Sequence, residues 1–298
     1  MRVLITGSKG FVGRHLGEYL TIGGHTVEGF NWRDGQDLSN YEQVRNTLDV
    51  FRPDRIYHLA AQAYVPESFA NPKRTFEVNT IGSLNLLEAV RQLGIKTRVL
   101  LAGTSEEYGD TGEVEEPITE KSLPNPLSPY AISKLAMDFL GRWHARAYGL
   151  PVVITRAYNH AGPGRGEMYA ESSFAKQIVE IENGVRKVIE HGNLESMRNY
   201  TDVRDIVRAY TQAIELDSGV YNICSDQNVS MQTIMDLLIK NAHTDIKTEV
   251  NTSLYRPSDF SFKKPSCEKF KKLTGWEPEI ELEQTLVDIL EDWRGRLT

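Results

Sequence analysis

Short apolar runs alternate with longer amphipathic stretches along the first half of the chain. Runs rich in Val, Ile and Leu predict buried strands, which are residues 2–6, 26–30, 55–61, 98–103 and 151–156. Apolar positions at helical spacing predict helices between them, which include residues 41–51, 72–93 and 129–148. Strands that alternate with helices in this way are typical of βαβ units. The pattern therefore predicts an α/β fold with a doubly wound parallel sheet.

The alternation loosens after residue 157, where a turn-rich loop begins. Beyond it the pattern predicts further elements: helices at 172–182 and 231–240, short strands at 187–189 and 220–223, and a helix whose N-terminal region carries Asp202 and Asp205. These elements indicate a smaller C-terminal α/β domain. The chain has no internal repeats and no low-complexity segment.

Composition excludes several classes of protein. Of the 298 residues, 40% are hydrophobic and 25% are charged, as in an ordinary globular protein. No apolar run is long enough to span a bilayer, and a strand that starts at residue 2 leaves no room for a signal peptide. The net charge of −7 argues against nucleic-acid binding. Cys224 and Cys267 lack metal-ligand spacing, so we expect a cytoplasmic protein with no disulfide framework and no metal site.

A glycine-rich turn follows the first strand directly. The spacing is G-x-x-G-x-x-G, and the turn leads into a helix. Glycines let the backbone approach a pyrophosphate closely, and the helix N-terminus offers free N–H groups and the positive end of its dipole. We therefore predict a dinucleotide site, contacted by Gly7, Gly10, Phe11, Val12 and Gly13.

Residues after the second strand bear on which dinucleotide binds. NAD sites commonly carry a carboxylate here, whereas an Arg suits the 2′-phosphate of NADP. This chain has the neutral Asn31 and the cation Arg33, which favour NADP, although the adjacent Asp34 leaves NAD open. Further candidate cofactor contacts are Asp37, Leu38, Leu59, Ala60, Ala61, Tyr130 and Lys134. His58 is expected to be a packed core residue.

Four residues form a candidate catalytic set. Tyr130 and Lys134 are four apart, so on a helix they share one face. An ammonium beside a phenol lowers the phenol pKa, which would let Tyr130 act as a general base on a sugar hydroxyl. Thr104 ends a predicted buried strand, and in extended geometry Glu106 points to the same side. Glu106 is thus a candidate acid or base, or else a solvated loop carboxylate.

Taken together, these motifs resemble the extended short-chain dehydrogenase/reductases that modify nucleotide sugars. The resemblance rests on the glycine turn, residues 58–62, Asn79, the set Thr104, Tyr130 and Lys134, and residues 156–159. Within that family, residues 159–167, 192–198 and 256–259 look like the GDP-mannose branch. The resemblance implies a Rossmann domain at 1–158, to which 199–224 return, and a nucleotide-sugar-binding domain made of 159–198 and 225–298.

Two enzymes of this branch compete as the implied function. GDP-mannose 4,6-dehydratase carries a Thr-Ser-Glu triplet like Thr104-Ser105-Glu106, whose Glu removes the C5 proton. The reductase that acts on its product, GDP-4-keto-6-deoxymannose, needs no such base, but its length matches this chain better. A sugar 4-epimerase and a non-catalytic NADP-binding regulator are further alternatives. We predict the dehydratase, with NADP as cofactor.

The resemblance also implies substrate contacts and a partner. Candidate nucleotide-sugar ligands are Gln62, Ser105, Asn159, Arg165, Lys176, Arg198 and Arg256. Guanidinium groups suit a diphosphate because they bind it through two parallel hydrogen bonds. Members of the family commonly pair through helices like 72–93 and 129–148, so we expect a homodimer.

Overall fold

A parallel sheet forms the centre of the larger of two bodies. The computed structural model describes residues 1–109, 117–255 and 264–298. Six strands pair in the order β2-β1-β3-β4-β5-β9, and every pair is parallel. The strands are β1 (Arg2–Thr6), β2 (Thr26–Phe30), β3 (Arg55–His58), β4 (Arg98–Ala102), β5 (Val152–Ala157) and β9 (Gly219–Ile223). The predicted doubly wound α/β fold is confirmed.

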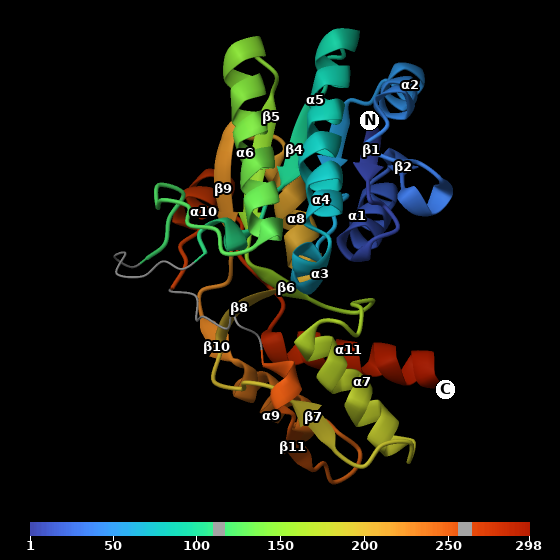
Figure 1. Ribbon diagram of the computed structural model, residues 1–298, viewed down its shortest axis with the longest axis vertical. Coiled ribbons are helices and arrows are strands. Elements are labelled where there is room, and N and C mark those ends of the chain that lie inside the picture. Colours follow the sequence, from blue (N-terminus) through green and yellow to red (C-terminus); the bar gives the residue numbers. More distant parts are fainter. Residues whose placement is uncertain (110–116, 256–263) are drawn as a thin grey trace.

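Helices cover both faces of this sheet (Figure 1). One face carries α2 (Tyr41–Phe51), α5 (Gly82–Leu93) and α6 (Pro129–Tyr148), and the other carries α1 (Phe11–Ile22) and α8 (Val203–Ala213). The alternation of side chains along β1 feeds both layers, because Val3 and Ile5 join one core cluster while Leu4 joins the other. Within the described residues, no helix has the length and apolarity needed to cross a membrane.

The helix predicted at 72–93 is interrupted. It consists of α4 (Pro72–Phe76), a π-helical segment η2 (Glu77–Ile81) and α5. The buried Asn79 lies in the π-helical segment, where its amide donates to Gln62 O at 3.0 Å and to Ser133 Oγ at 2.9 Å. The wider turn thus coincides with a polar link between three segments, which apolar spacing alone does not signal. A short helix, α3 (Val65–Ala70), precedes this region.

The smaller body lies below the sheet in Figure 1. It has a three-stranded sheet in the order β10-β8-β6, a two-stranded sheet β11-β7, and a core among three helices. Its strands are β6 (Asn159–Ala161), β7 (Ile189–His191), β8 (Met197–Asp202), β10 (Asn228–Ser230) and β11 (Thr248–Val250). Its helices are α7 (Ala170–Glu182), α9 (Met231–Lys240) and α11 (Leu282–Leu297).

The chain crosses between the bodies more than once. After β8, α8 and β9 run through the larger body, and α10 (Glu268–Thr274) contributes Phe270 to the same core cluster as α8. The predicted segment 199–224 therefore contains both a strand of the smaller sheet and the edge strand of the larger one. The exact domain boundaries remain a prediction.

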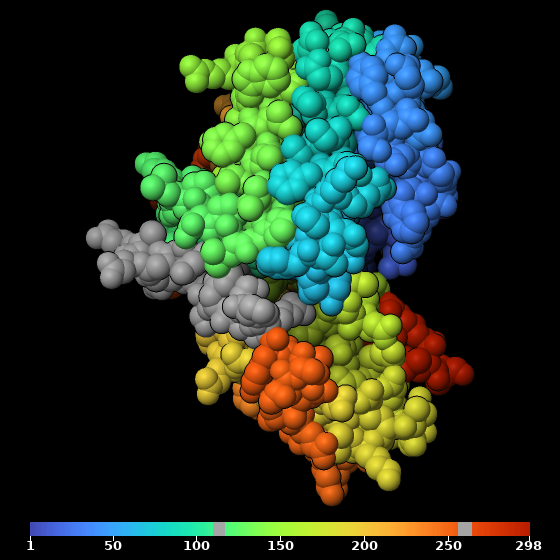
Figure 2. Space-filling model, viewed as in Figure 1, coloured from blue at the N-terminus to red at the C-terminus, as the bar shows by residue number. Residues whose placement is uncertain are grey.

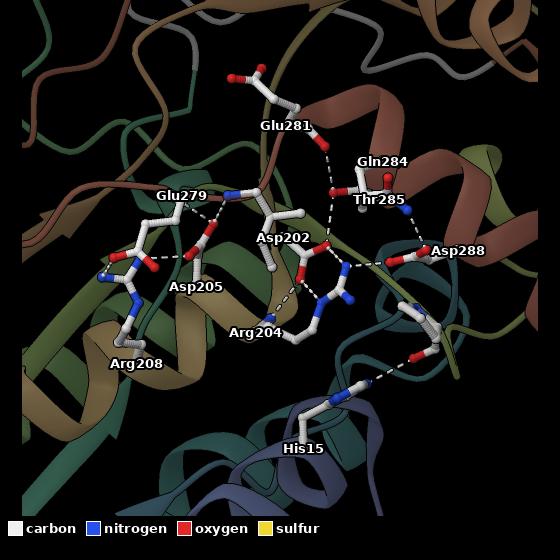
Figure 3. A network of polar contacts seen from close by, with 12 residues as sticks. His15, Asp202, Arg204, Asp205, Arg208, Glu279, Glu281, Gln284, Thr285 and Asp288 are labelled. Carbon is white, nitrogen blue, oxygen red and sulfur yellow. Dashed lines mark hydrogen bonds and ion pairs between the residues drawn. The ribbon is translucent and has the colours of Figure 1, made fainter.

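A polar network fixes the crossing from β8 into α8 (Figure 3). Asp202 caps α8 and accepts from Thr285 Oγ1 at 2.8 Å, while Arg204 bridges Asp202 and Asp288 of α11. Asp205 accepts from the backbone N–H groups of 279 and 280, each at 3.0 Å. The network ties the last helix of the smaller body to the start of α8.

Candidate functional site

A cleft of about 800 Å³ opens at the carboxyl ends of the large sheet, where the two bodies meet. Figure 2 shows the larger body, blue to green, above the smaller one, yellow to orange. Residues of both bodies line the cleft, from the glycine turn at one end to residues 190–200 and 253–255 at the other. Parallel α/β sheets bind ligands at this edge.

The glycine turn forms one wall of the cleft. Gly7 has φ +75°, and a Cβ there would lie 2.9 Å from the backbone of Ala60. A Cβ on Gly13 would lie 2.2 Å from the carbonyl oxygen of Gly7. Backbone therefore packs directly on backbone, and the N-terminal residues of α1 line the cleft. This geometry fits the pyrophosphate of a dinucleotide. The predicted residues that line the cleft here are Gly7, Gly10, Phe11, Val12, Gly13, Leu59 and Ala61.

The residues after β2 lie beside this turn and outside the cleft itself. Asn31 is buried, and its Oδ1 accepts from the N–H of Lys9 at 3.0 Å. Asp34 forms an ion pair with the Lys9 ammonium. The carboxylate that kept NAD as an alternative to NADP is therefore already paired with a cation. The Arg33 guanidinium lies 5.9 Å from the ring centroid of the exposed Trp32.

The two remaining cofactor candidates after β2 differ in exposure. Asp37 faces Arg74 at 3.7 Å, with its side chain partly exposed. Leu38 is a core residue and packs beneath Gly82. Both lie outside the cleft lining.

The four candidate catalytic residues all line the cleft. The extended geometry expected for 104–106 is wrong, because Ser105–Glu107 form a 3-10 turn, η3. Thr104 caps this turn by accepting from the N–H of Glu106 at 3.3 Å. The turn brings Thr104 and Glu106 into the cleft all the same. Ser105, a candidate substrate ligand, is buried away from it.

The pKa of Tyr130 is raised, contrary to the expected lowering. Burial raises this pKa, the hydrogen bond with Thr104 opposes the rise, and the nearby Glu106 carboxylate adds to it. Burial lowers the pKa of Lys134 to about 8, and its ammonium donates to Ala102 O at 2.8 Å. In the protein alone Tyr130 is a protonated phenol at neutral pH. The neutral phenol can donate a proton directly. To act as a base it must first lose its proton, which requires additional positive charge nearby to stabilise the phenolate.

Arg165 connects the start of α1 in the larger body with the smaller body. Its guanidinium lies 4.9 Å from the ring centroid of Phe11, at the start of α1, and 3.7 Å from that of Tyr169. Its Nε donates to Glu171 at 2.9 Å. The same loop is held from α1 by His15, which donates to Pro163 O at 2.8 Å.

The remaining substrate candidates divide into three groups. Asn159 and Arg198 line the cleft together with Arg165. Gln62 lies outside the lining and hydrogen-bonds the backbone of Tyr64 in both directions, at 2.7 and 3.1 Å. Lys176 faces a separate depression of about 200 Å³ and pairs there with Glu167. Arg256 lies outside the described residues.

Several residues of the site were not predicted. Tyr64, Glu167, Tyr169 and His191 line the cleft, and no spacing in the sequence marks them. A buried network of Glu107, Asp138 and Arg156 lies beneath the catalytic set. It has a sequence signal, because a lone Arg at the end of an apolar strand requires a buried counter-charge.

Comparison with known proteins places these features in context. A family model described as GDP-mannose 4,6 dehydratase matches residues 34–289. The GDP-6-deoxy-D-mannose reductase of Pseudomonas aeruginosa is 33% identical over 99% of this chain and 98% of its own length. GDP-mannose 4,6 dehydratase 1 of Arabidopsis thaliana is 28% identical over 97% of this chain and 88% of its own length.

Solved structures agree with this fold. RMD from Pseudomonas aeruginosa, complexed with NADPH, superposes with a TM-score of 0.90 at 32% identity and covers 99% of both chains. The UDP-glucose 4-epimerase of Thermus thermophilus, in complex with NAD, superposes with a TM-score of 0.88 at 30% identity and also covers 99% of both chains.

Proposed function

The chain belongs to the GDP-mannose 4,6-dehydratase family, and within it we propose that this protein is the NADP-dependent dehydratase that converts GDP-mannose into GDP-4-keto-6-deoxymannose. One observation carries the choice. The carboxylate of Glu106 lines the cleft close enough to Tyr130 to raise the pKa of that phenol, and Thr104 hydrogen-bonds the same phenol. A base at this place has a task in dehydration and none in a simple carbonyl reduction.

Each residue then has a separate step. Tyr130 takes the proton of the sugar 4-OH, with Lys134 supplying positive charge nearby, and Thr104 orients O4. A bound NADP, held at the glycine turn, would supply the hydride acceptor for C4 and the hydride donor for C6. The new 4-keto group acidifies the C5 proton, which Glu106 removes. The C6 hydroxyl leaves as water with the proton that Tyr130 took from the 4-OH, and Glu106 returns its proton to C5 when C6 receives hydride. The sum is loss of one water with no net oxidation or reduction.

The 4-keto reductase is the second candidate. The Pseudomonas reductase matches this chain almost end to end, whereas 88% of the Arabidopsis dehydratase is covered. Reduction uses Tyr130, Lys134 and Thr104, with the protonated phenol donating to the keto oxygen. The raised pKa of Tyr130 suits that direction.

Mass spectrometry of the sugar separates these functions. The purified protein is incubated with GDP-mannose and catalytic NADP, with no reductant. We expect the sugar to lose the mass of one water with no net change in the cofactor. No reaction there, but NADPH consumption on adding the 4-keto-6-deoxy sugar, would establish the reductase. A product isomer of unchanged mass would indicate a 4-epimerase. The absence of any turnover would indicate a non-catalytic binding protein.

Cofactor choice is tested at Arg33. We propose that Arg33 contacts the 2′-phosphate of NADP. Arg33→Ala is expected to weaken NADPH binding by about tenfold, because a charge-assisted hydrogen bond to phosphate contributes about 1.5 kcal/mol. NADH binding is expected to stay within about twofold, since NADH lacks that phosphate. Fluorescence titration of both reduced cofactors measures the effect, with Arg146→Ala at the far end of α6 as the control. Equal losses for both cofactors would contradict the assignment.

We propose a homodimer formed through the helical segment 72–93, which comprises α4, η2 and α5, and through α6. Ile132, Phe139 and Trp143 are half-exposed and follow one another at helical spacing on α6. Trp143→Glu is expected to halve the mass measured by light scattering, because it places a charge in the interface. Val50→Glu, at an equally apolar and more exposed position on α2, is the control and should leave the mass unchanged. A wild-type mass of one chain would rule the dimer out.

The two cysteines bear on where the protein works. Cys224 and Cys267 are buried free thiols, and Cys267 Sγ lies 3.2 Å from Cys224 O. Chains with few cysteines and no disulfide framework are typical of reducing compartments. We therefore propose the cytoplasm as its location.

A further inference from the structure

A buried charge network lies directly beneath the catalytic residues. Glu107, Asp138 and Arg156 have exposures of 0%, 0% and 2%. They come from the η3 turn, α6 and β5, the elements that carry or border Thr104, Glu106, Tyr130 and Lys134. Burying three charged side chains is costly unless they are well paired and hydrogen-bonded. The proposed chemistry assigns these three side chains no task.

Glu107 holds the catalytic turn through both of its oxygens. Oε1 accepts from the backbone N–H of Thr104 at 3.0 Å, and Oε2 accepts from Arg156 Nε at 2.8 Å. The fit is close, since a Cβ on Gly103 would lie 2.7 Å from Oε1. Burial and the neighbouring Asp138 raise the pKa of Glu107, whereas Arg156 and the N–H of Thr104 oppose that rise. Because both oxygens accept hydrogen bonds, these contacts favour the ionised carboxylate. Thr104 is therefore fixed from behind by Glu107.

Arg156 connects this turn to the helix of the catalytic Tyr and Lys. Its terminal nitrogen donates to Asp138 Oδ2 at 2.8 Å, and its guanidinium lies 4.9 Å from the ring centroid of Tyr108. Asp138 is four residues after Lys134, one turn further along α6. The half-exposed Arg142 binds its other oxygen at 2.6 Å. Each carboxylate of the network thus has a guanidinium partner.

The surroundings of Lys134 single out Glu107. The Lys134 ammonium donates to Ala102 O at 2.8 Å, and Glu107 accepts from the N–H of Thr104, two residues further along the chain, so both charged groups lie at the same turn. Burial lowers the pKa of Lys134, and Glu107 opposes that fall. The other polar groups near it are the Tyr130 phenol on α6 and His58 on β3, whose pKa burial lowers to about 3, so both are neutral at pH 7. Arg156 on β5 and Asp138 on α6 pair with each other.

We propose that Glu107 is a positioning residue, whose buried carboxylate is the counter-charge of Lys134 and holds the turn that carries Thr104 and Glu106. The inference assigns a role within the proposed function. Its electrostatic part concerns the protein alone, so it can be measured without turnover. Lys134 is charged only below its pKa, and removing the counter-charge lowers that pKa. The ammonium is then lost at a lower pH.

NMR titration of Lys134 tests this directly. The full-length protein is labelled with ¹³C at lysine Cε, and the Lys134 signal is assigned with Lys134→Met. The wild-type midpoint is expected near pH 8. In Glu107→Gln it is expected to fall by about one pH unit, because a nearby opposite charge shifts a pKa by at least that much. The matched control is Asp138→Asn, which also removes a carboxylate from Arg156 but leaves the Glu107 carboxylate in place.

The outcomes separate charge from structure. An unchanged midpoint in Glu107→Gln, or an equal shift in Asp138→Asn, would overturn the proposal. If the variant does not fold, Glu107→Asp serves instead, because it keeps the charge and should keep most of the midpoint. If the protein turns over the sugar, the alkaline limb of its pH–rate profile should move to lower pH in Glu107→Gln, as the Lys134 midpoint does. A shifted Lys134 midpoint in a protein without turnover would leave this inference standing and reject the proposed function.

Discussion

In the Glu106→Gln variant, dehydration of GDP-mannose is expected to fall by a factor of about 10³, while oxidation at C4 continues. Removal of a positioned general base costs this order of rate, and glutamine keeps the shape of the side chain without its basicity. C4 oxidation uses Tyr130, whose pKa should fall slightly once the neighbouring carboxylate is gone. Single-turnover experiments with stoichiometric NADP measure both steps, as reduced-nicotinamide absorbance and as loss of water by mass spectrometry.

The control carboxylate is Glu167, which also lines the cleft but is largely exposed and pairs with Lys176. Glu167→Gln should leave the dehydration step intact. Exchange of the C5 proton with deuterated solvent gives a second check, because it requires the same base and should disappear only in Glu106→Gln. Equal loss of C4 oxidation and dehydration would mean that Glu106 has a role other than C5 base.

The Gly13→Ala variant is expected to lose about 3 kcal/mol of unfolding free energy and its measurable NADPH binding. Its Cβ would lie 2.2 Å from Gly7 O and 2.7 Å from the Cα of Ser8, so the backbone of the turn must move. Overpacking that shifts backbone costs on this scale. Urea denaturation and cofactor titration measure the two effects.

Gly17→Ala, one turn further along α1, is the matched control. Its Cβ meets only Ile5 Cδ1, at an ordinary 3.9 Å. Alanine in a helix interior is favoured over glycine by about 0.5–1 kcal/mol, so this variant should be slightly more stable and bind NADPH normally. If Gly13→Ala behaved like Gly17→Ala, the turn would have to be more adaptable than its contacts allow.

Local patterns were enough to predict the large sheet and the glycine turn. Strands such as β4 are continuous apolar runs because both faces are covered, and the glycine spacing has a direct steric cause. The break at Glu77–Ile81 could not be predicted in the same way. It accompanies the partners of Asn79, which lie far away in the sequence at Gln62 and Ser133.

The candidate site was predicted in part for similar reasons. The pairing of Tyr130 with Lys134 follows from helical spacing, but the pKa of Tyr130 depends on burial, which spacing does not give. Extended geometry placed Glu106 beside Thr104, whereas a capped 3-10 turn does so in the structure. Glu107 was overlooked because its partner Arg156 is a neighbour only after β4 and β5 pair.

The contacts of Arg165 make the two halves of the cleft one thermodynamic unit. Phe11 begins α1, at whose N-terminus we propose that the pyrophosphate binds, and its ring centroid lies 4.9 Å from the guanidinium of Arg165, a proposed contact of the nucleotide sugar. A bound dinucleotide that orders Phe11 therefore also favours the ordered position of Arg165. By linkage, the dinucleotide and the sugar then raise each other's binding affinity by the same factor. A dehydratase returns its hydride to the same sugar molecule, so mutual retention of cofactor and sugar keeps the half-reacted pair together until the hydride is returned.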